Sequence, residues 1–188
     1  MTTSDTDTAY RHRQDPWVSA SEADWSREVP RTWWDPSRKL IRSIRRYQAL
    51  SEKGGVWAKA HRKWWVIVHR FWSIITQSEI DLTAQIGGGL ILPHPTGIVI
   101  HPDVIIGPNC LIFHHVTIGR TANAQRVATI GGHVDIGAGA AILGPITVSD
   151  HVLIGANAVV THDVPARHVA FGIPAKVRPR DDMYTEKK

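Results

Sequence analysis

The chain has 188 residues, of which 43% are hydrophobic and 21% charged, so it supports one sizeable packed domain and excludes global disorder. The net charge of +5 comes mainly from the first third, and no aromatic-plus-basic nucleic-acid module is visible, so nucleic acid is not an expected partner. The single cysteine, Cys110, excludes an intrachain disulfide and a CxxC metal site.

The composition of the N-terminal residues indicates no targeting signal. Its first twenty residues are polar and lack the apolar core of a secretory signal. The apolar patch at residues 64–68 is too short to span a bilayer. We therefore expect a cytoplasmic protein, with the inner face of the membrane as a further option.

Residues 1–15 are polar and are expected to form a disordered tail, and residues 16–78 are expected to form an N-terminal helical region. Ser19 or Ser21 is expected to cap a short helix that ends at Pro30.

Two longer helices are expected after this one. Asp35-Pro36-Ser37 is typical of a helix start, and Gly54-Gly55 predicts its end. Apolar residues recur at helical spacing within it, at Leu40, Ile41, Ile44 and Tyr47, and Lys39, Arg42, Arg45 and Arg46 are expected on the other side. The third helix is expected over residues 56–76.

All eight tryptophans lie before residue 73. The favoured interpretation is a helical cap whose aromatic rings pack on the next domain or on sister subunits. The second interpretation is a helix on a membrane surface, because tryptophan together with lysine and arginine suits the lipid interface.

From residue 79 to residue 178 the chain follows a six-residue repeat. The repeat positions are all apolar: Ile80, Ile86, Leu92, Ile98, Val104, Cys110 and Val116, then Ile130, Ile136, Ile142, Val148, Ile154 and Val160. A period of six matches neither an amphipathic helix nor an alternating strand, and it predicts a β-solenoid with triangular coils, in which each unit supplies one strand and one turn. Cys110 is then a buried stacking residue rather than a nucleophile.

The register slips by two positions between Val116 and Ile130, and the polar segment 120–126 between them predicts a loop ejected from the solenoid. Loops on rigid scaffolds commonly carry ligand contacts. The regular pattern ends at Pro165, and residues 179–188 are expected to form a polar tail.

Several motifs in residues 79–178 resemble the serine acetyltransferase family of hexapeptide-repeat acyltransferases. Glu79-Ile80 followed by Ala84-Gln85-Ile86-Gly87 is similar to the family's acidic-Ile opening. Three further segments carry the resemblance: His94-Pro95-Thr96-Gly97-Ile98-Val99, Val116-Thr117-Ile118-Gly119 and the closing Gly172-Ile173-Pro174-Ala175-Lys176.

The resemblance implies a mainly β fold, a left-handed parallel β-helix with an N-terminal α-helical region. It also implies homotrimers that bind acetyl-CoA in the groove between subunits. It assigns His94 as general base and Glu79 as the carboxylate that orients the imidazole. By the same resemblance, Gly119, Ala138 and Ala156 border the pantetheine arm, and Lys176 meets the CoA phosphates.

The chain departs from the family at two positions that recognise serine. Pro93 stands where the family has an acidic residue, and Val127 stands where it has a second histidine, although Arg126 is retained. The His114-His115 pair before Val-Thr-Ile-Gly resembles smaller polysaccharide-biosynthesis acetyltransferases instead. Arg126, His114 and His115 are therefore candidate acceptor-binding residues.

These features predict an acetyl-CoA-dependent O-acetyltransferase whose acceptor is a sugar of a polysaccharide or its precursor. The alternative is a serine O-acetyltransferase of cysteine biosynthesis. A non-catalytic hexapeptide-repeat protein is a third option, which retention of Glu79 and His94 disfavours. No metal is expected; a zinc enzyme using His101, His114, His115 and His133 is a minor alternative, because their spacing is irregular relative to the coils.

Overall fold

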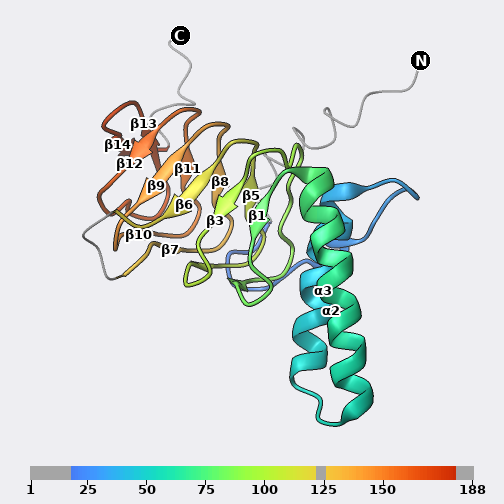
Figure 1. Cartoon of the computed structure of the whole chain (residues 1–188). Coiled ribbons are helices and arrows are strands. Elements are labelled where there is room, and N and C mark those ends of the chain that lie inside the picture. Colours follow the sequence, from blue (N-terminus) through green and yellow to red (C-terminus); the bar gives the residue numbers. More distant parts are fainter. Residues whose placement is uncertain (1–17, 122–125, 181–188) are drawn as a thin grey trace.

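The computed structural model describes residues 18–121 and 126–180 (Figure 1). The tail expected at residues 1–15, most of the tail expected at 179–188 and the middle of the expected loop lie outside the described residues. Within the described ranges, no helix combines the length and the apolar character needed to cross a membrane.

Two helices form a hairpin at the N-terminal end of a β-solenoid (Figure 1). They are α2 (Pro36–Ser51) and α3 (Val56–Thr76). The Asp35 carboxylate caps α2 by accepting a hydrogen bond from the backbone nitrogen of Arg38, and Pro36 occupies the first turn. These bounds confirm both predicted helices.

The helix predicted after Ser19 or Ser21 is wrong in extent and in its cap. Only a 3-10 turn forms, η2 (Trp25–Glu28), and Asp24 caps it. The Ser19 hydroxyl instead accepts hydrogen bonds from the backbone nitrogens of Ser21 and Glu22 in a local turn. The side-chain amide of Asn109 holds this segment against the solenoid by donating to the carbonyls of Ser19 and Glu22.

The solenoid is a left-handed parallel β-helix with three faces, as predicted. Sheet A comprises β1 (Glu79–Ile80), β3 (Val99–Ile100), β6 (Thr117–Gly119), β9 (Ala141–Leu143) and β12 (Val159–Val160). Sheet B comprises β2 (Gln85–Ile86), β4 (Ile105–Ile106), β7 (Thr129–Ile130) and β10 (Thr147–Val148). Sheet C comprises β5 (Leu111–Ile112), β8 (Asp135–Ile136), β11 (Leu153–Ile154), β13 (His168–Phe171) and the antiparallel β14 (Lys176–Pro179).

The turns between faces define three edges. The A–B edge contains the turns from sheet A to sheet B, the B–C edge those from B to C, and the C–A edge those from C back to A. Because strands of successive coils pair in parallel, turns of one edge lie directly above one another, about 4.8 Å apart per coil.

The interior of the solenoid is a stack of aliphatic side chains. All thirteen predicted repeat residues are buried, with exposed fractions between 0% and 8%. Cys110 is fully buried in the same stack, as predicted. This burial confirms the hexapeptide repeat as the source of the core.

The predicted position of the register slip is wrong, because two insertions interrupt the coils rather than one. Counted on sheet A, two of the four coils are eighteen residues long, as the pairing of Val99 with Thr117 and of Ala141 with Val159 shows. Glu79, however, pairs with Val99, twenty positions later, so the turn at residues 92–98 holds two extra residues. The coil containing residues 120–128 is longer by six, because Thr117 pairs with Ala141.

The hairpin closes the open end of the solenoid. A sheet end leaves backbone carbonyls without partners, and α2 satisfies them here. The Arg45 guanidinium donates to the carbonyls of Ile86 (2.5 Å) and Gly87 (2.7 Å), and it forms a two-point ion pair with buried Glu28. Arg45 was expected among the residues lining the other side of α2, and it turns toward the solenoid because these acceptors lie there. Leu40, Ile41 and Ile44 complete the closure by joining the solenoid core.

Candidate active site

His94 lies at the first turn of the C–A edge, in the turn that contains the two extra residues. Buried Leu92 and Ile98 anchor the two ends of this turn, and His94 between them is exposed. The turn is also tied to the end of α3, because the backbone nitrogen of Gly97 donates to the carbonyl of Gln77 at 3.0 Å. The imidazole therefore projects from a fixed backbone rather than from a loose loop.

Two further histidines lie beside His94, one coil further along the C–A edge. The ring centroids of His94 and His114 are 6.1 Å apart, and those of His114 and His115 are 5.4 Å apart. The backbone nitrogen of His115 donates to the carbonyl of Thr96 at 2.8 Å, which joins the two turns. The structure thus brings together three residues that the sequence proposed separately.

The close approach of these turns depends on Gly97. Its φ is +69°, and a Cβ added there would lie 2.3 Å from Nδ1 of His115, so no larger residue fits. Nδ1 of His114 is buried without a hydrogen-bond partner in the described part of the chain. A buried, unpaired imidazole nitrogen is a group that a ligand or a neighbouring subunit can satisfy.

Glu79 is exposed on β1, in the segment next to the His94 turn. Its backbone nitrogen donates to the carbonyl of Ile98 at 2.8 Å, and the hydroxyl of Ser78 donates to the carbonyl of Pro95. Among the described residues, no hydrogen bond or ion pair joins the side chains of Glu79 and His94. The two residues are thus on adjoining segments without direct contact between their side chains.

The predicted cofactor residues divide between two edges. Ala138 and Ala156 continue the C–A edge, since the nitrogen of Gly139 donates to the His114 carbonyl and that of Asn157 to the Ala138 carbonyl. Exposed Lys176, which pairs with Phe171 at the end of sheet C, lies where this edge ends. Gly119 instead lies at the A–B edge, where its carbonyl accepts from the nitrogen of Gly144.

Arg126 is also on the A–B edge, exposed at the end of the long insertion. His94 and Arg126 therefore lie on different edges of the same solenoid. Contact between them requires two chains side by side, the A–B edge of one facing the C–A edge of another.

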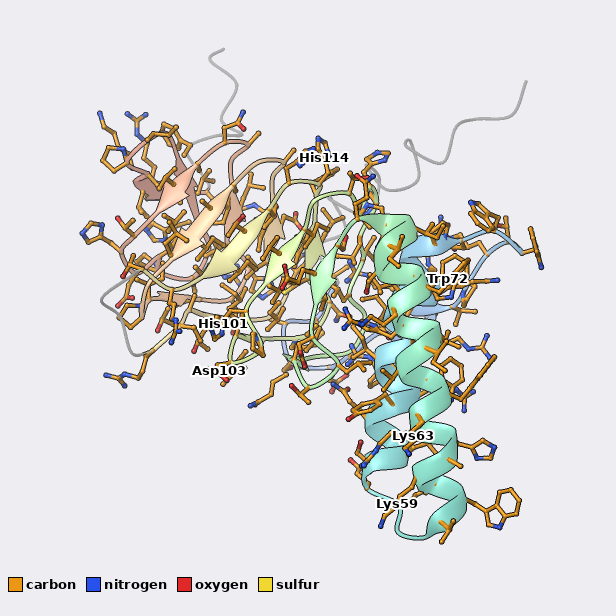
Figure 2. All side chains as sticks on the ribbon, viewed as in Figure 1. Lys59, Lys63, Trp72, His101, Asp103 and His114 are labelled. Atoms are coloured by element: carbon orange, nitrogen blue, oxygen red, sulfur yellow. The ribbon has the colours of Figure 1, made fainter. Side chains whose placement is uncertain are left out.

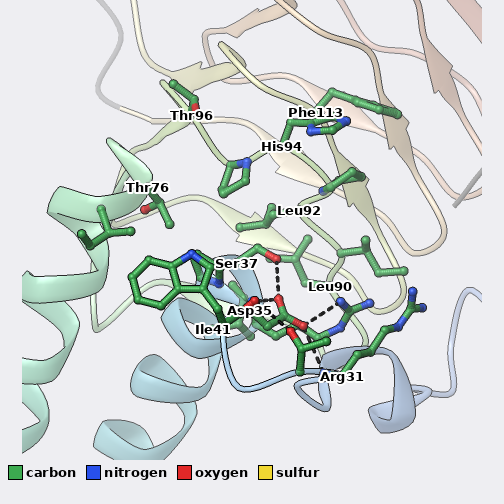
Figure 3. A pocket seen from close by; sticks show the side chains of 18 residues that line it. Arg31, Asp35, Ser37, Ile41, Thr76, Leu90, Leu92, His94, Thr96 and Phe113 are labelled. Carbon is green, nitrogen blue, oxygen red and sulfur yellow. Dashed lines mark hydrogen bonds and ion pairs between the residues drawn. The ribbon is translucent and has the colours of Figure 1, made fainter. Parts of the chain in front are cut away.

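A pocket of about 630 Å³ lies between the N-terminal segment, the end of α3 and the His94 turn (Figure 3). Its walls are mostly apolar, with polar groups from His94, Thr96, Asp35 and Arg31. Burial raises the pKa of Asp35, but hydrogen bonds from Arg31 and Arg38 outweigh it and leave the pKa below its usual value. The carboxylate is therefore ionised, and its donors come from the chain itself.

The sequence did not reveal this pocket. Asp35 was recognised only as a helix start, and nothing in the linear pattern placed residues 31–38 beside His94. The one signal in the sequence was the acidic cap residue Asp35. Its position beside the His94 turn becomes apparent only when α2 is docked on the solenoid.

The histidines named for the minor zinc alternative are distributed over all three edges. His101 is at the A–B edge, His114 and His115 are at the C–A edge, and His133 is at the B–C edge, and Figure 2 shows His101 and His114 well separated. In the described ranges, no group of three or more His, Cys, Asp or Glu side chains is arranged to hold a metal ion.

Known proteins are similar to this chain in sequence and in shape. A probable serine acetyltransferase of rice (Oryza sativa subsp. japonica) is 39% identical over 134 residues, which cover 70% of this chain and 39% of that protein. The chain thus spans about two fifths of the length of the curated relatives it matches first. No protein-family model matches.

Two solved structures illustrate the similarity in shape. Serine acetyltransferase from Brucella abortus in complex with coenzyme A has a TM-score of 0.68 at 29% identity, covering 91% of this chain and 64% of that one. Soybean serine acetyltransferase complexed with serine has a TM-score of 0.62 at 34% identity, covering 74% of this chain and 56% of that one.

Proposed function

Because this chain belongs to the serine acetyltransferase family of hexapeptide-repeat acyltransferases, we propose that it is an acetyl-CoA-dependent O-acetyltransferase. The acceptor we propose is L-serine. The observation that carries the proposal is the C–A edge, where His94 and His114 lie in one column with Ala138 and Ala156.

This acceptor replaces the one favoured by the sequence. A sugar acceptor rested on the losses at Pro93 and Val127 and on the paired histidines. The comparisons do not support it, since the matching proteins are serine acetyltransferases and one of them was solved with serine. The alternative stated from the sequence fits these findings better.

The C–A edge suits a thin, extended donor. Ala138 and Ala156 leave the edge free of bulky side chains between the histidines and Lys176, and three coils separate the Thr96 turn from Ala156, about 14 Å of edge. Acetyl-CoA supplies a thioester carbonyl there, and its phosphates suit the exposed charge of Lys176.

His94 acts as the general base in this proposal. An imidazole nitrogen takes the proton of the acceptor hydroxyl while the oxygen bonds to the acetyl carbon. The carbon–sulfur bond then breaks, and His94 returns the proton to the departing sulfur. Glu79, on the adjoining segment, orients the ring and stabilises its charged form once the side chains turn toward one another.

A homotrimer would complete the site. Gly119 and Arg126 lie at the A–B edge, so they reach the C–A edge only from a neighbouring chain. Arg126 would then hold the serine carboxylate, because a guanidinium matches a carboxylate with two parallel hydrogen bonds.

A second acceptor class remains a candidate because of one observation. The pocket beside His94, at about 630 Å³, has the size of pockets that hold drug-sized ligands. With Pro93 and Val127 lacking the polar groups of the family, a larger hydroxyl-bearing acceptor would also fit.

The test is release of the CoA thiol from acetyl-CoA, with L-serine and a panel of sugars as acceptors. We expect turnover with serine and a loss of about 10²- to 10⁴-fold in kcat for His94→Ala. The matched control is His61→Ala, an exposed histidine on α3 away from the C–A and A–B edges, which should leave kcat unchanged. Turnover with a sugar alone would favour the second acceptor class, and full activity of the His94 variant would refute the mechanism.

A further inference from the structure

The outer face of α3 is an exposed apolar stripe. It consists of Trp57 (82% exposed), Trp64 (58%), Ile67 (62%), Phe71 (50%) and Ile74 (74%). These positions repeat at intervals of three, four and seven, so they lie along one side of the helix. The opposite side packs on α2, where His69 and Thr76 are buried.

The hairpin is also strongly basic. Between residues 36 and 76 there are ten Lys or Arg residues and a single acidic residue, Glu52, although the whole chain has a net charge of only +5. Helix α3 itself contains no Asp or Glu. Lys59, Lys63 and Arg70 follow one flank of the apolar stripe, and Figure 2 shows Lys59 and Lys63 on the hairpin, away from the solenoid.

We propose that the outer face of α3 docks on an anionic lipid surface. Tryptophan and phenylalanine on one face with lysine and arginine along its border are typical of a helix that lies in the plane of a membrane interface. The stripe would enter the boundary between headgroups and acyl chains, and the basic flank would pair with lipid phosphates.

A second copy of the chain is a poorer occupant for this face. In an antiparallel pair of α3 stripes, the two rows formed by Lys59, Lys63 and Arg70 would lie on the same side of the contact, with no acidic residue on either helix. These like charges would repel one another, whereas an anionic surface would neutralise the basic row of each chain.

The arrangement leaves the C–A edge free. The hairpin stands at the N-terminal end of the solenoid, and sheet C ends at the other extreme (Figure 1). Docking would therefore tether the protein without covering Ala138, Ala156 or Lys176. Membrane docking does not depend on which acceptor the enzyme uses.

Sedimentation of the full chain with vesicles tests the proposal. We expect binding to phosphatidylcholine vesicles that contain phosphatidylglycerol, and none to phosphatidylcholine alone. Binding should fall sharply between about 0.1 M and about 1 M salt, where the Debye length shrinks from about 10 Å to about 3 Å.

Charge reversal tests the assigned face. The double variant Lys59→Glu/Lys63→Glu should weaken binding at least about twentyfold, because each basic residue near the surface contributes about fivefold. Arg167→Glu/Arg178→Glu changes the net charge equally at the far end of the solenoid, and it should bind as the unmodified protein does. Equal losses in both variants would overturn the proposal.

The apolar variant Trp57→Ser/Ile67→Ser separates lipid from self-association. Both side chains are exposed, so the fold should persist, and vesicle binding should fall at least about tenfold with no change in oligomer size by light scattering. A smaller oligomer together with no vesicle binding by the unmodified protein would make the face a subunit interface and refute the proposal.

Discussion

Replacing Arg45 by methionine should destabilise the protein far more than its position on a basic helix indicates. The substitution preserves the aliphatic stem but removes the guanidinium that pairs with Glu28 at 2.8 Å and 3.0 Å. Glu28 is only 8% exposed, so its charge would remain buried without its ion-pair partner. The carbonyls of Ile86 and Gly87 would lose their donors as well.

The structure sets the size of this effect. Breaking a buried ion pair by removing one partner costs about 3–5 kcal/mol. Because Arg45 is partly exposed, we expect the lower end of this range, about 3 kcal/mol. Glu28→Gln should cost less, about 1–2 kcal/mol, because the amide oxygen can still accept from the nitrogens of Gly89 and Leu90.

Urea unfolding at a fixed protein concentration, followed by tryptophan fluorescence, measures these differences. The concentration is held constant because an oligomer's stability depends on it. Arg46→Met is the matched control, since Arg46 is the exposed neighbour on the same helix, and it should change stability by less than about 0.5 kcal/mol. Equal effects of the two methionine variants would refute the role of α2 as the closure of the solenoid.

Two further predictions concern buried titrating groups. Burial raises the pKa of the Cys110 thiol to about 12, so a thiol reagent at about pH 8 should label it only after unfolding; rapid labelling of the native protein would contradict its place in the stack. Burial and the neighbouring His151 lower the pKa of His133 to about 4 from 6.5. The unfolded chain then takes up a proton that the folded chain does not, so stability should fall by about 2 kcal/mol through this residue between about pH 7 and about pH 5. His133→Asn, which tolerates the φ of 52°, should reduce this acid sensitivity, and an unchanged pH dependence of urea unfolding would exclude His133 as its source.

The sequence alone determined the architecture of the solenoid, because each coil is formed by residues that are close together in the sequence. A strand of two residues and a turn need only an inward aliphatic side chain at the repeat, and Ile130, Ile136 and Ile142 supply it one face after another. The two long helices were equally local, since Asp35-Pro36 begins α2 through cap chemistry and Gly54-Gly55 separates α2 from α3.

The arrangement of the candidate site was decided by tertiary structure. The repeat shows which residues point inward, but an inserted residue shifts every later turn, and the two extra residues beside His94 could not be distinguished from a slip further along. The placement of His94 on the C–A edge and of Arg126 on the A–B edge depends on where these extra residues lie along the chain. The direction of Arg45 depends on carbonyls more than forty positions away, and only the docked hairpin brings them within reach.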